Sequence, residues 1–236
     1  MEVLDLLISF DFEKDFNPQN IIKTLQKGET IVLIENFPLL DHEFQSFINS
    51  IGDSVKENRN NCRQDIFDVK ISKQNNFFTS IAASAFSFPL HTDCADFDVI
   101  PNCVGFLCVE PAIKEQGANN FVFLRKIINQ LSENVIHNLL HKKWKFRNQY
   151  RSILSGNNGN YHICYDRITM ESFSEINEKE IEELNNLDKI FEANSFKIKL
   201  KKQDLVLFRN DLLLHGRDEI DIDSKRLIKR IRFNMN

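Results

Sequence analysis

Apolar residues along the chain fall into short runs that are separated by polar segments. Residues 67–71 and 196–201 alternate apolar with charged side chains, whereas residues 29–36, 103–109 and 205–208 are short runs dominated by apolar residues. Alternation predicts strands with one exposed face, and short apolar runs predict strands that are buried on both faces. The pattern therefore predicts a chain that is largely β-structure.

Helical spacing of apolar residues occurs in separate blocks between these strands. Helices are expected at 17–28, at 41–52 with Asp41 as the cap, in two pieces over 121–144, and from Asn177, where Glu180 can complete a capping box. The helices do not alternate regularly with strands, which argues against a doubly wound sheet. A β-sandwich or open barrel with helices packed on one side fits this order better.

The predicted C-terminal strand, from Lys225 to Phe233, has an unusual distribution of charge. Arg226, Arg230 and Arg232 fall on one face, because side chains alternate along a strand. Such a face is either exposed to water or used against anions inside a cavity. The strand alone leaves both interpretations open.

Composition favours one domain over residues 1–236 and excludes some partners. The 236 residues include only 7 Gly and 5 Pro, and no Pro/Gly/Ser-rich linker divides them. The net charge of −4 argues against a nucleic-acid partner, and no basic run suggests a membrane partner. Five irregularly spaced cysteines, without a Cys-x-x-Cys pair, are typical of reduced thiols. With an acidic N-terminus unlike a signal peptide, they predict a cytoplasmic protein.

His91 and Asp93 are the first candidates for chemistry. In an extended segment their side chains project from one face, so that three residues supply two metal ligands. They lie just ahead of the buried strand at 103–109, a position that suits the mouth of a barrel. A second His on a facing strand would complete the arrangement of two His and one carboxylate that marks non-haem Fe(II) oxygenases, and His215 is the candidate.

A second pair of histidines offers a weaker alternative. His137 and His141 lie four residues apart on a predicted helix and could hold a metal. No acidic residue stands between them as in the His-Glu-x-x-His zinc motif. Two solvent-facing histidines are the simpler interpretation.

Further residues extend the pattern around the triad in a fixed order and spacing. They are His91-Thr92-Asp93, Gly117, Asp204, Asn210, Leu214-His215-Gly216-Arg217, Arg226 and Arg230. With these residues the chain resembles the Fe(II)/2-oxoglutarate dioxygenases of the taurine dioxygenase type, including their clavaminate synthase-like amino-acid hydroxylases, from about Val32 to the C-terminus. The resemblance implies a mainly β fold with flanking helices around a double-stranded β-helix, or jelly-roll, core.

The resemblance also implies roles for individual residues. His91, Asp93 and His215 would bind Fe(II), Arg226 would pair with the distal carboxylate of 2-oxoglutarate, and Asn119 would donate a further hydrogen bond to this cosubstrate. Three protein ligands leave three positions on iron, two for the cosubstrate and one for O₂. Related halogenases need a small residue in place of the acid, so Asp93 predicts hydroxylation or a related oxidation instead.

The same resemblance suggests a class of substrate. In taurine-type enzymes an Arg at the position of Arg230 holds the acid group of the substrate. Tyr165-Asp166 resembles a Tyr-Asp pair of the amino-acid hydroxylases, in which Asp166 could receive a substrate amine. We therefore expect a small carboxylate-bearing substrate, a free amino acid or a close derivative.

Two rival functions remain open from the sequence. Demethylases of alkylated nucleic acids use the same triad with an Arg-x5-Arg strand, a spacing that Arg226 and Arg232 satisfy, although the acidic balance and the lack of a basic aromatic loop speak against this substrate. A non-catalytic barrel that binds a small acid is the other rival. In that case, His91 and His215 would only satisfy hydrogen bonds in the core. The sequence carries no prediction of oligomeric state.

Overall fold

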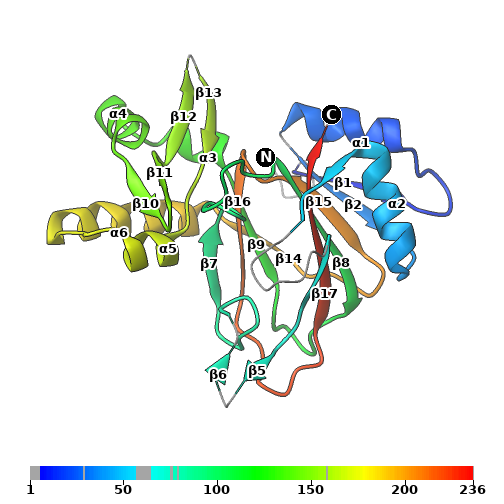
Figure 1. Ribbon diagram of the computed structural model, residues 1–236. Helices are drawn as coiled ribbons and strands as arrows, with labels where there is room; N and C mark the ends of the chain where they lie inside the picture. Colours follow the sequence, from blue (N-terminus) through cyan, green and yellow to red (C-terminus); the bar gives the residue numbers. More distant parts are fainter. Residues whose placement is uncertain are drawn as a thin grey trace.

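The computed structural model describes residues 6–28, 30–56, 65–74, 77–78, 80–157 and 159–235. Over these ranges the chain is mainly β, with helices gathered at two sides (Figure 1). The prediction of a mainly β chain with helices is thus confirmed. The loop expected at 53–65, with Cys62, lies largely outside the described residues.

A seven-stranded sheet forms the larger half of the β-structure. Its neighbouring strands are antiparallel apart from the parallel pair β1 and β2. In order across the sheet, the strands are β1 (Leu7–Asp11), β2 (Ile31–Glu35), β15 (Leu205–Arg209), β8 (Cys103–Glu110), β17 (Leu227–Met235) and β3 (Gly52–Ser54), with β4 (Ile66–Val69) also paired to β17.

A second sheet of four antiparallel strands carries most of the candidate site. Its order is β14 (Phe196–Ile198), β9 (Asn119–Phe123), β16 (Leu213–Arg217) and β7 (Phe88–His91). Three hairpins complete the β-structure: β5 (Lys73–Gln74) with β6 (Phe77–Phe78), β10 (Trp144–Phe146) with β11 (Gln149–Arg151), and β12 (Leu154–Asn157) with β13 (Asn160–Ile163).

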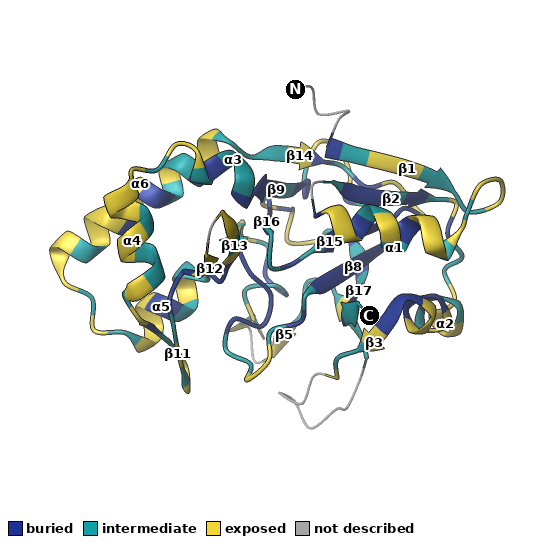
Figure 2. Ribbon diagram, turned by 90° about the horizontal axis from the view of Figure 1, so that it is seen from above, coloured by how far each residue is buried: buried dark blue, intermediate teal, exposed yellow. Residues whose placement is uncertain are grey.

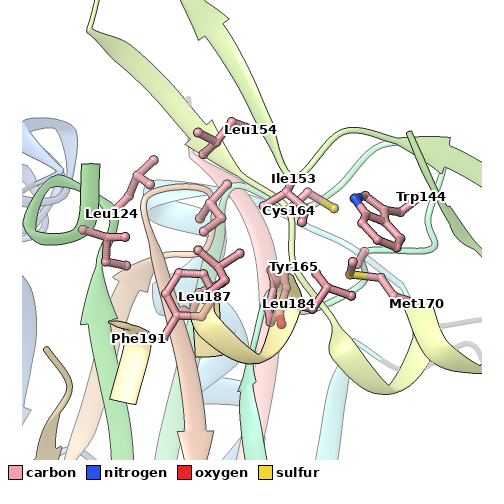
Figure 3. Close-up of a cluster of buried hydrophobic side chains, with 14 of the residues drawn as sticks. Leu124, Trp144, Ile153, Leu154, Cys164, Tyr165, Met170, Leu184, Leu187 and Phe191 are labelled. Carbon is pink, nitrogen blue, oxygen red and sulfur yellow. The ribbon is translucent and has the colours of Figure 1, made fainter. Parts of the chain in front are cut away.

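The helices cover two sides of the molecule, not one as the sequence suggested. Helices α1 (Pro18–Lys27) and α2 (Asp41–Ile51) pack on the outer face of the large sheet. The others, with hairpins β10/β11 and β12/β13, surround a separate cluster beside the small sheet (Figure 3). They are α3 (Leu124–Ile128), α4 (Glu133–His141), α5 (Arg167–Phe173) and α6 (Glu178–Ala193). Figure 2 shows their exposed outer faces in yellow and the buried strands in dark blue.

A third hydrophobic cluster fills the space between the two sheets. Val104, Phe106 and Cys108 of β8 face Phe121 and Phe123 of β9 there. A buried aromatic side chain contributes about 2–3 kcal/mol through the hydrophobic effect, so these alternating residues hold the sheets together. This cluster fixes which face of each central strand looks inward.

The parity of β17 places its arginines on the inward face. Ile228 belongs to the cluster between the sheets, whereas Ile231 and Phe233 pack outward under the helices. Arg226, Arg230 and Arg232 therefore project inward, and all three are buried. Of the two interpretations, solvent exposure is wrong.

Residues 121–123 were expected to begin a helix and instead end strand β9. Their side chains alternate between two clusters, with Phe121 and Phe123 between the sheets and Val122 on the opposite side. Pairing with β16 and β14 satisfies the backbone, so the tertiary structure overrides helical spacing. The helix begins only at Leu124.

Four residues were expected to cap helices, namely Asn17, Asp41, Ser132 and Asn177, and three of them do. The Ser132 side chain caps α4 by accepting a hydrogen bond from Val135 N at 3.4 Å. Asn17 accepts a hydrogen bond from Gln19 N at 2.9 Å, and Asn177 forms the expected capping box with Glu180. Asp41 is the first helical residue of α2 and not its cap, because Leu40 occupies that position without a side-chain hydrogen bond. Its negative charge still stabilises α2 through a favourable interaction with the positive end of the helix dipole.

The described cysteines lie in the interior. Cys94, Cys103, Cys108 and Cys164 are all buried. Burial raises the pKa of Cys103, Cys108 and Cys164 to about 12, which keeps these three thiols protonated and unreactive. None of the helices in the described ranges is both long and apolar enough to cross a membrane.

Candidate active site

Strand pairing brings the two candidate histidines together. His91 ends β7 and stands directly opposite His215 of β16, with their ring centroids 4.3 Å apart. Opposite residues of an antiparallel pair point to the same face. The strands approach so closely beside this pair that a Cβ atom on Gly216 would lie 2.6 Å from Phe88 O.

Asp93 reaches the same point from the turn that follows β7. Its Oδ1 lies 3.5 Å from Nε2 of His91 and 4.0 Å from Nε2 of His215. One potential ligand atom from each of the three residues lies within 4.8 Å of the others, and all three residues are buried. Within the described ranges, this is the one cluster of His, Cys, Asp and Glu with metal-binding geometry.

Both imidazoles direct Nε2 toward Asp93. His91 Nδ1 lies 2.9 Å from Pro89 O, and because a carbonyl only accepts, Nδ1 carries a proton, which leaves Nε2 as the nitrogen of His91 that can bind a metal. Burial, then the charge of His91, lowers the pKa of His215 well below its usual value. Among the described atoms, His215 Nδ1 has no hydrogen-bond partner. This disfavours the rival function, a non-catalytic barrel in which His215 would only satisfy hydrogen bonds in the core.

Two arginines hold Asp93 in its ionised state. Arg232 Nε donates to Oδ2 at 2.8 Å, and Arg230 Nη1 donates to Oδ1 at 3.3 Å. Burial alone would raise the pKa of Asp93, but the charges of Arg230 and Arg232 outweigh it and hold this pKa well below the usual value. The site thus contains one ionised carboxylate and two imidazoles, a donor set that suits a divalent transition metal.

The turn around Asp93 is fixed through its backbone by Asn210. The amide oxygen of Asn210 accepts from Asp93 N at 2.9 Å, and its Nδ2 donates to Asp93 O at 3.0 Å and Pro101 O at 2.8 Å. Thr92 adds to this support, since its backbone N donates to Tyr165 O at 2.6 Å. Asn210 was part of the sequence motif, but no role in holding Asp93 was predicted from it.

Asn210→Ala is expected to weaken both the fold and the metal site. It leaves buried backbone groups without partners, at a cost of roughly 3 kcal/mol, which corresponds to a fall in Tm of about 6–12 °C for a chain of this size. Thermal unfolding followed by circular dichroism measures the fall. Asn234→Ala is a matched control, because Asn234 Oδ1 accepts one partly buried hydrogen bond from Asn102 N. An Asn210→Ala protein as stable as this control would contradict the role given to Asn210.

Arg226 and Asn119 form a second polar centre beside His215. Arg226 Nη2 donates to Asn119 Oδ1 at 3.2 Å, and both residues are buried. Burial, with the charge of Arg217, lowers the pKa of Arg226 to about 10. A buried cation whose hydrogen-bond acceptor is a neutral amide favours an anionic ligand. The adjoining cavity, of about 40 Å³, is also lined by Phe106 and Ile228.

Gly117 controls the approach to Arg226. Its φ is +63°, and a Cβ atom there would lie 3.2 Å from Arg226 Cδ and 2.6 Å from a methyl group of Ile220. We expect Gly117→Ala to cost about 1–3 kcal/mol in stability and to raise the KM for 2-oxoglutarate by displacing Arg226. Thermal unfolding and cosubstrate kinetics measure these effects. Gly159→Ala is the control, because Gly159 also has a positive φ but has open space around it. It therefore introduces backbone strain without displacing Arg226. Equal KM values for 2-oxoglutarate in the two variants would contradict the prediction.

A larger cavity, of about 530 Å³, opens on the other side of the triad. His91, Asp93, Arg230 and Arg232 line it, and Asp166 lies on its wall. The Asp166 carboxylate caps α5 by accepting from Thr169 N at 3.1 Å. This cavity shares Ala82, Phe88, His91 and Arg230 with the smaller one, so the two lie next to each other.

Tyr165 is the predicted site residue that the structure does not bring to the cavity. Its side chain lies inside the cluster beside the small sheet (Figure 3), and its hydroxyl donates to Asp188 Oδ1 at 2.6 Å. Tyr165 contributes to the site only through its backbone, because its carbonyl accepts a hydrogen bond from Thr92 N. The adjacent Asp166 faces the cavity because the chain turns into α5 between them.

His137 and His141 lie away from this site on the exposed side of α4. Their rings stack with centroids 4.1 Å apart, and His141 Nδ1 lies 2.7 Å from His137 O. Both side chains are exposed, and in the described part of the chain no acidic residue joins them in a metal-binding cluster. The geometry agrees with two solvent-facing histidines.

Arg232 is the residue of this site whose role the sequence did not predict. It was placed on the same strand face as Arg226 and Arg230, but it was considered only for its spacing from Arg226. Its contact with Asp93 joins positions 139 residues apart in the sequence. The sequence did contain a signal for this role, because Arg232 lies on the same strand face as Arg226 and Arg230, which already had assigned roles.

Comparison with solved structures shows the same fold in several oxygenases. Asparagine oxygenase (AsnO) superimposes with a TM-score of 0.75 at 15% identity, covering 92% of this chain and 79% of that chain. PvcB, described as an Fe, alpha-ketoglutarate dependent oxygenase from an isonitrile synthetic pathway, gives 0.73 at 14% identity, covering 96% and 85%. The non-heme iron oxygenase OrfP gives 0.73 at 10% identity, covering 93% and 81%. No curated protein sequence matches the chain.

The sequence itself matches one family over nearly its whole length. The matched region runs from residue 9 to residue 232 and includes both sheets and every residue of the candidate site. This match confirms the resemblance that the motifs indicated and the prediction of a dioxygenase. The chain belongs to the taurine catabolism dioxygenase TauD, TfdA family.

Proposed function

We propose that the protein is an Fe(II)- and 2-oxoglutarate-dependent oxygenase that hydroxylates a free amino acid or a close derivative. The two facing sheets would form its double-stranded β-helix core, and residues 1–236 would form one catalytic domain. The observation that carries the proposal is the convergence of His91, Asp93 and His215, whose potential ligand atoms lie within 4.8 Å of one another in a buried site.

Three features of the triad support Fe(II) binding. Two neutral imidazoles and one ionised carboxylate are the ligands of mononuclear non-haem iron sites, and they leave half of the coordination shell open. Among the described atoms, Nδ1 of His215 has no hydrogen-bond partner, which supports a role for this ring beyond hydrogen bonding in the core. With 2-oxoglutarate and O₂, bound iron supplies an oxidant strong enough for an unactivated C–H bond.

Arg226 is suited to hold the distal carboxylate of 2-oxoglutarate. Its planar guanidinium can donate two parallel hydrogen bonds to a carboxylate, and Asn119 beside it offers an amide donor. The cavity next to them is too small for a five-carbon diacid by itself. It is lined by His91 and His215 as well as by Arg226, so a cosubstrate held at Arg226 would lie beside the metal ligands.

The larger cavity has the charge distribution expected for an amino acid. Arg230 lies beside the metal ligands and can pair with a substrate carboxylate, and Asp166 on the wall can receive an amine. Two proteins of the same fold support this choice: asparagine oxygenase has been solved with Fe(II), 2S,3S-3-hydroxyasparagine and succinate, and OrfP with Fe, succinate and (3S)-hydroxy-L-Arg. Because Asp93 keeps the carboxylate, we propose hydroxylation and not halogenation.

A screen of amino acids tests this proposal. The protein is incubated with Fe(II), 2-oxoglutarate, O₂ and pools of amino acids and their simple derivatives. We expect one pool to increase succinate release and to yield a product heavier by one oxygen atom. Alkylated single-stranded DNA in a parallel reaction tests the demethylase rival, which predicts binding with a steep salt dependence. Activity on the DNA and on none of the amino-acid pools would mean that the substrate is a nucleic acid and not an amino acid.

Asp166→Asn is expected to weaken substrate binding while leaving the cosubstrate unaffected. It removes the charge but keeps an oxygen that caps α5. Loss of a charge-assisted hydrogen bond costs about 1.5–3 kcal/mol, which is roughly a 10- to 100-fold increase in KM for the amino acid. Steady-state kinetics with each substrate measures the two KM values. Asp98→Asn, at an exposed position outside the cavity lining, is the control; equal substrate KM values in the two variants would remove Asp166 from the site.

The cytoplasmic location remains a prediction from the cysteine content and the N-terminal sequence. The net charge of −4 continues to favour a small molecule over a nucleic acid.

A further inference from the structure

The two oxygens of the Asp93 carboxylate have different surroundings. Oδ1 lies on the side of His91 and His215, at 3.5 and 4.0 Å from their Nε2 atoms. Oδ2 is the acceptor of a 2.8 Å hydrogen bond from Arg232 Nε. An arginine therefore holds the oxygen that does not face the histidines.

Arg232 is well placed to fix the orientation of this carboxylate. It lies on β17, which pairs with β8 and β4 on its two sides, and its carbonyl accepts from Val55 N at 2.7 Å. The Arg232 side chain is 4% exposed. A charge-assisted hydrogen bond of this length in a dry site is strong, so Asp93 rotates little about its last bond while Arg232 is present.

Arg230 contacts the other oxygen of the same carboxylate. Its Nη1 lies 3.3 Å from Oδ1, the oxygen nearest the histidines, and its guanidinium also stacks over Phe67 at 5.2 Å. A metal ion held by His91 and His215 would need this same oxygen. One arginine thus supports Oδ1 as a metal ligand, and the other competes for it.

We propose that Arg232 is a positioning residue for the metal site, which holds Oδ2 of Asp93 so that Oδ1 alone faces the metal, whereas Arg230 competes with the metal for Oδ1. This inference rests on the proposed function, because it takes Asp93 as a metal ligand. It extends that function by giving opposite roles to two arginines that carry the same charge next to the same carboxylate.

Co(II) titration of Arg232→Met and Arg230→Met, followed by calorimetry without 2-oxoglutarate, tests the proposal. Each variant removes one positive charge beside Asp93, so a purely electrostatic effect on the metal would be the same in both. Loss of a hydrogen bond that orients a ligand typically costs 10- to 100-fold in metal affinity. We expect Arg232→Met to bind Co(II) at least ~10-fold more weakly than the wild type, and Arg230→Met to bind it as tightly or more tightly.

Two results would overturn the proposal. One is an Arg232→Met protein that binds Co(II) as tightly as the wild type or more tightly, which would leave Arg232 as an internal ion pair. The other is an Arg230→Met protein that loses as much affinity as Arg232→Met. A wild-type protein that binds no Co(II) would overturn the proposed function as well, so the two failures are distinguishable.

A second variant covers a failure of Arg232→Met to fold, which circular dichroism detects. Arg232→Lys keeps the charge but replaces the planar fork with a single ammonium group. Under the proposal it binds Co(II) more weakly than the wild type, because charge without the Nε–Oδ2 geometry does not fix the carboxylate. Wild-type affinity in Arg232→Lys would mean that charge alone is required, and would overturn the positioning role.

Discussion

His91→Ala is expected to abolish metal binding and, with it, the consumption of 2-oxoglutarate. Four-ligand metal sites have apparent binding free energies of about 10–16 kcal/mol, so one ligand is worth about 3 kcal/mol or more. This is a loss of ~100-fold or more in affinity, and the remaining His215 and Asp93 cannot define a facial site alone. Calorimetric titration with Co(II) and succinate release in the presence of Fe(II) measure the two effects.

His137→Ala is the matched control for this experiment. His137 is exposed on α4 and has a second histidine beside it, so it tests whether any surface histidine contributes to the measured binding. We expect it to leave metal affinity unchanged. If His137→Ala lost the metal and His91→Ala kept it, the assignment of the metal site would be wrong.

Arg226→Gln is expected to raise the KM for 2-oxoglutarate by roughly 100-fold. A buried charge-assisted pair with a carboxylate is worth about 3 kcal/mol, and glutamine preserves a hydrogen-bond donor without the charge. The KM for 2-oxoglutarate, measured by succinate release, reports the change. Lys225→Gln removes a charge from the adjacent exposed residue and should leave this KM unchanged. An Arg226→Gln enzyme with the wild-type KM would mean that the cosubstrate binds elsewhere.

The pKa of Arg226 adds a test that needs no substitution. Burial, together with Arg217, lowers this pKa to about 10 in the free protein. A cation is present below its pKa and lost above it, so affinity for 2-oxoglutarate should be constant at neutral pH and fall as the pH rises through 10. Cosubstrate binding measured from pH 7 to pH 10.5 on Co(II)-loaded protein follows this change.

Local patterns in the sequence predicted the two strands of the large sheet that border the site. The alternation over residues 225–233 placed Arg226, Arg230 and Arg232 on one face, and the apolar run at 103–109 predicted the buried strand that became β8. Whether that face points inward depends on the position of the second sheet, which local sequence patterns do not predict. Residues 121–123 show the same limit, because their strand exists through pairing with β14 and β16.

The position of the metal ligands was predictable to different degrees. His91 and Asp93 could be placed together from their spacing, whereas His215 could be joined to them only through the order of a longer motif. Its register opposite His91 comes from strand pairing between distant segments. Tyr165 was grouped with Asp166 because the two resemble a Tyr-Asp pair of the amino-acid hydroxylases, but the start of α5 sends their side chains to different places.

Addition of Fe(II) and 2-oxoglutarate to the protein without air tests the central claim most directly. If His91, Asp93 and His215 hold one iron beside Arg226, chelation of that iron by the keto acid produces a weak visible charge-transfer band in the wild type. The band should be absent from His91→Ala and retained in His137→Ala. A wild-type protein that gives no band, or a His91→Ala protein that keeps it, would contradict the account.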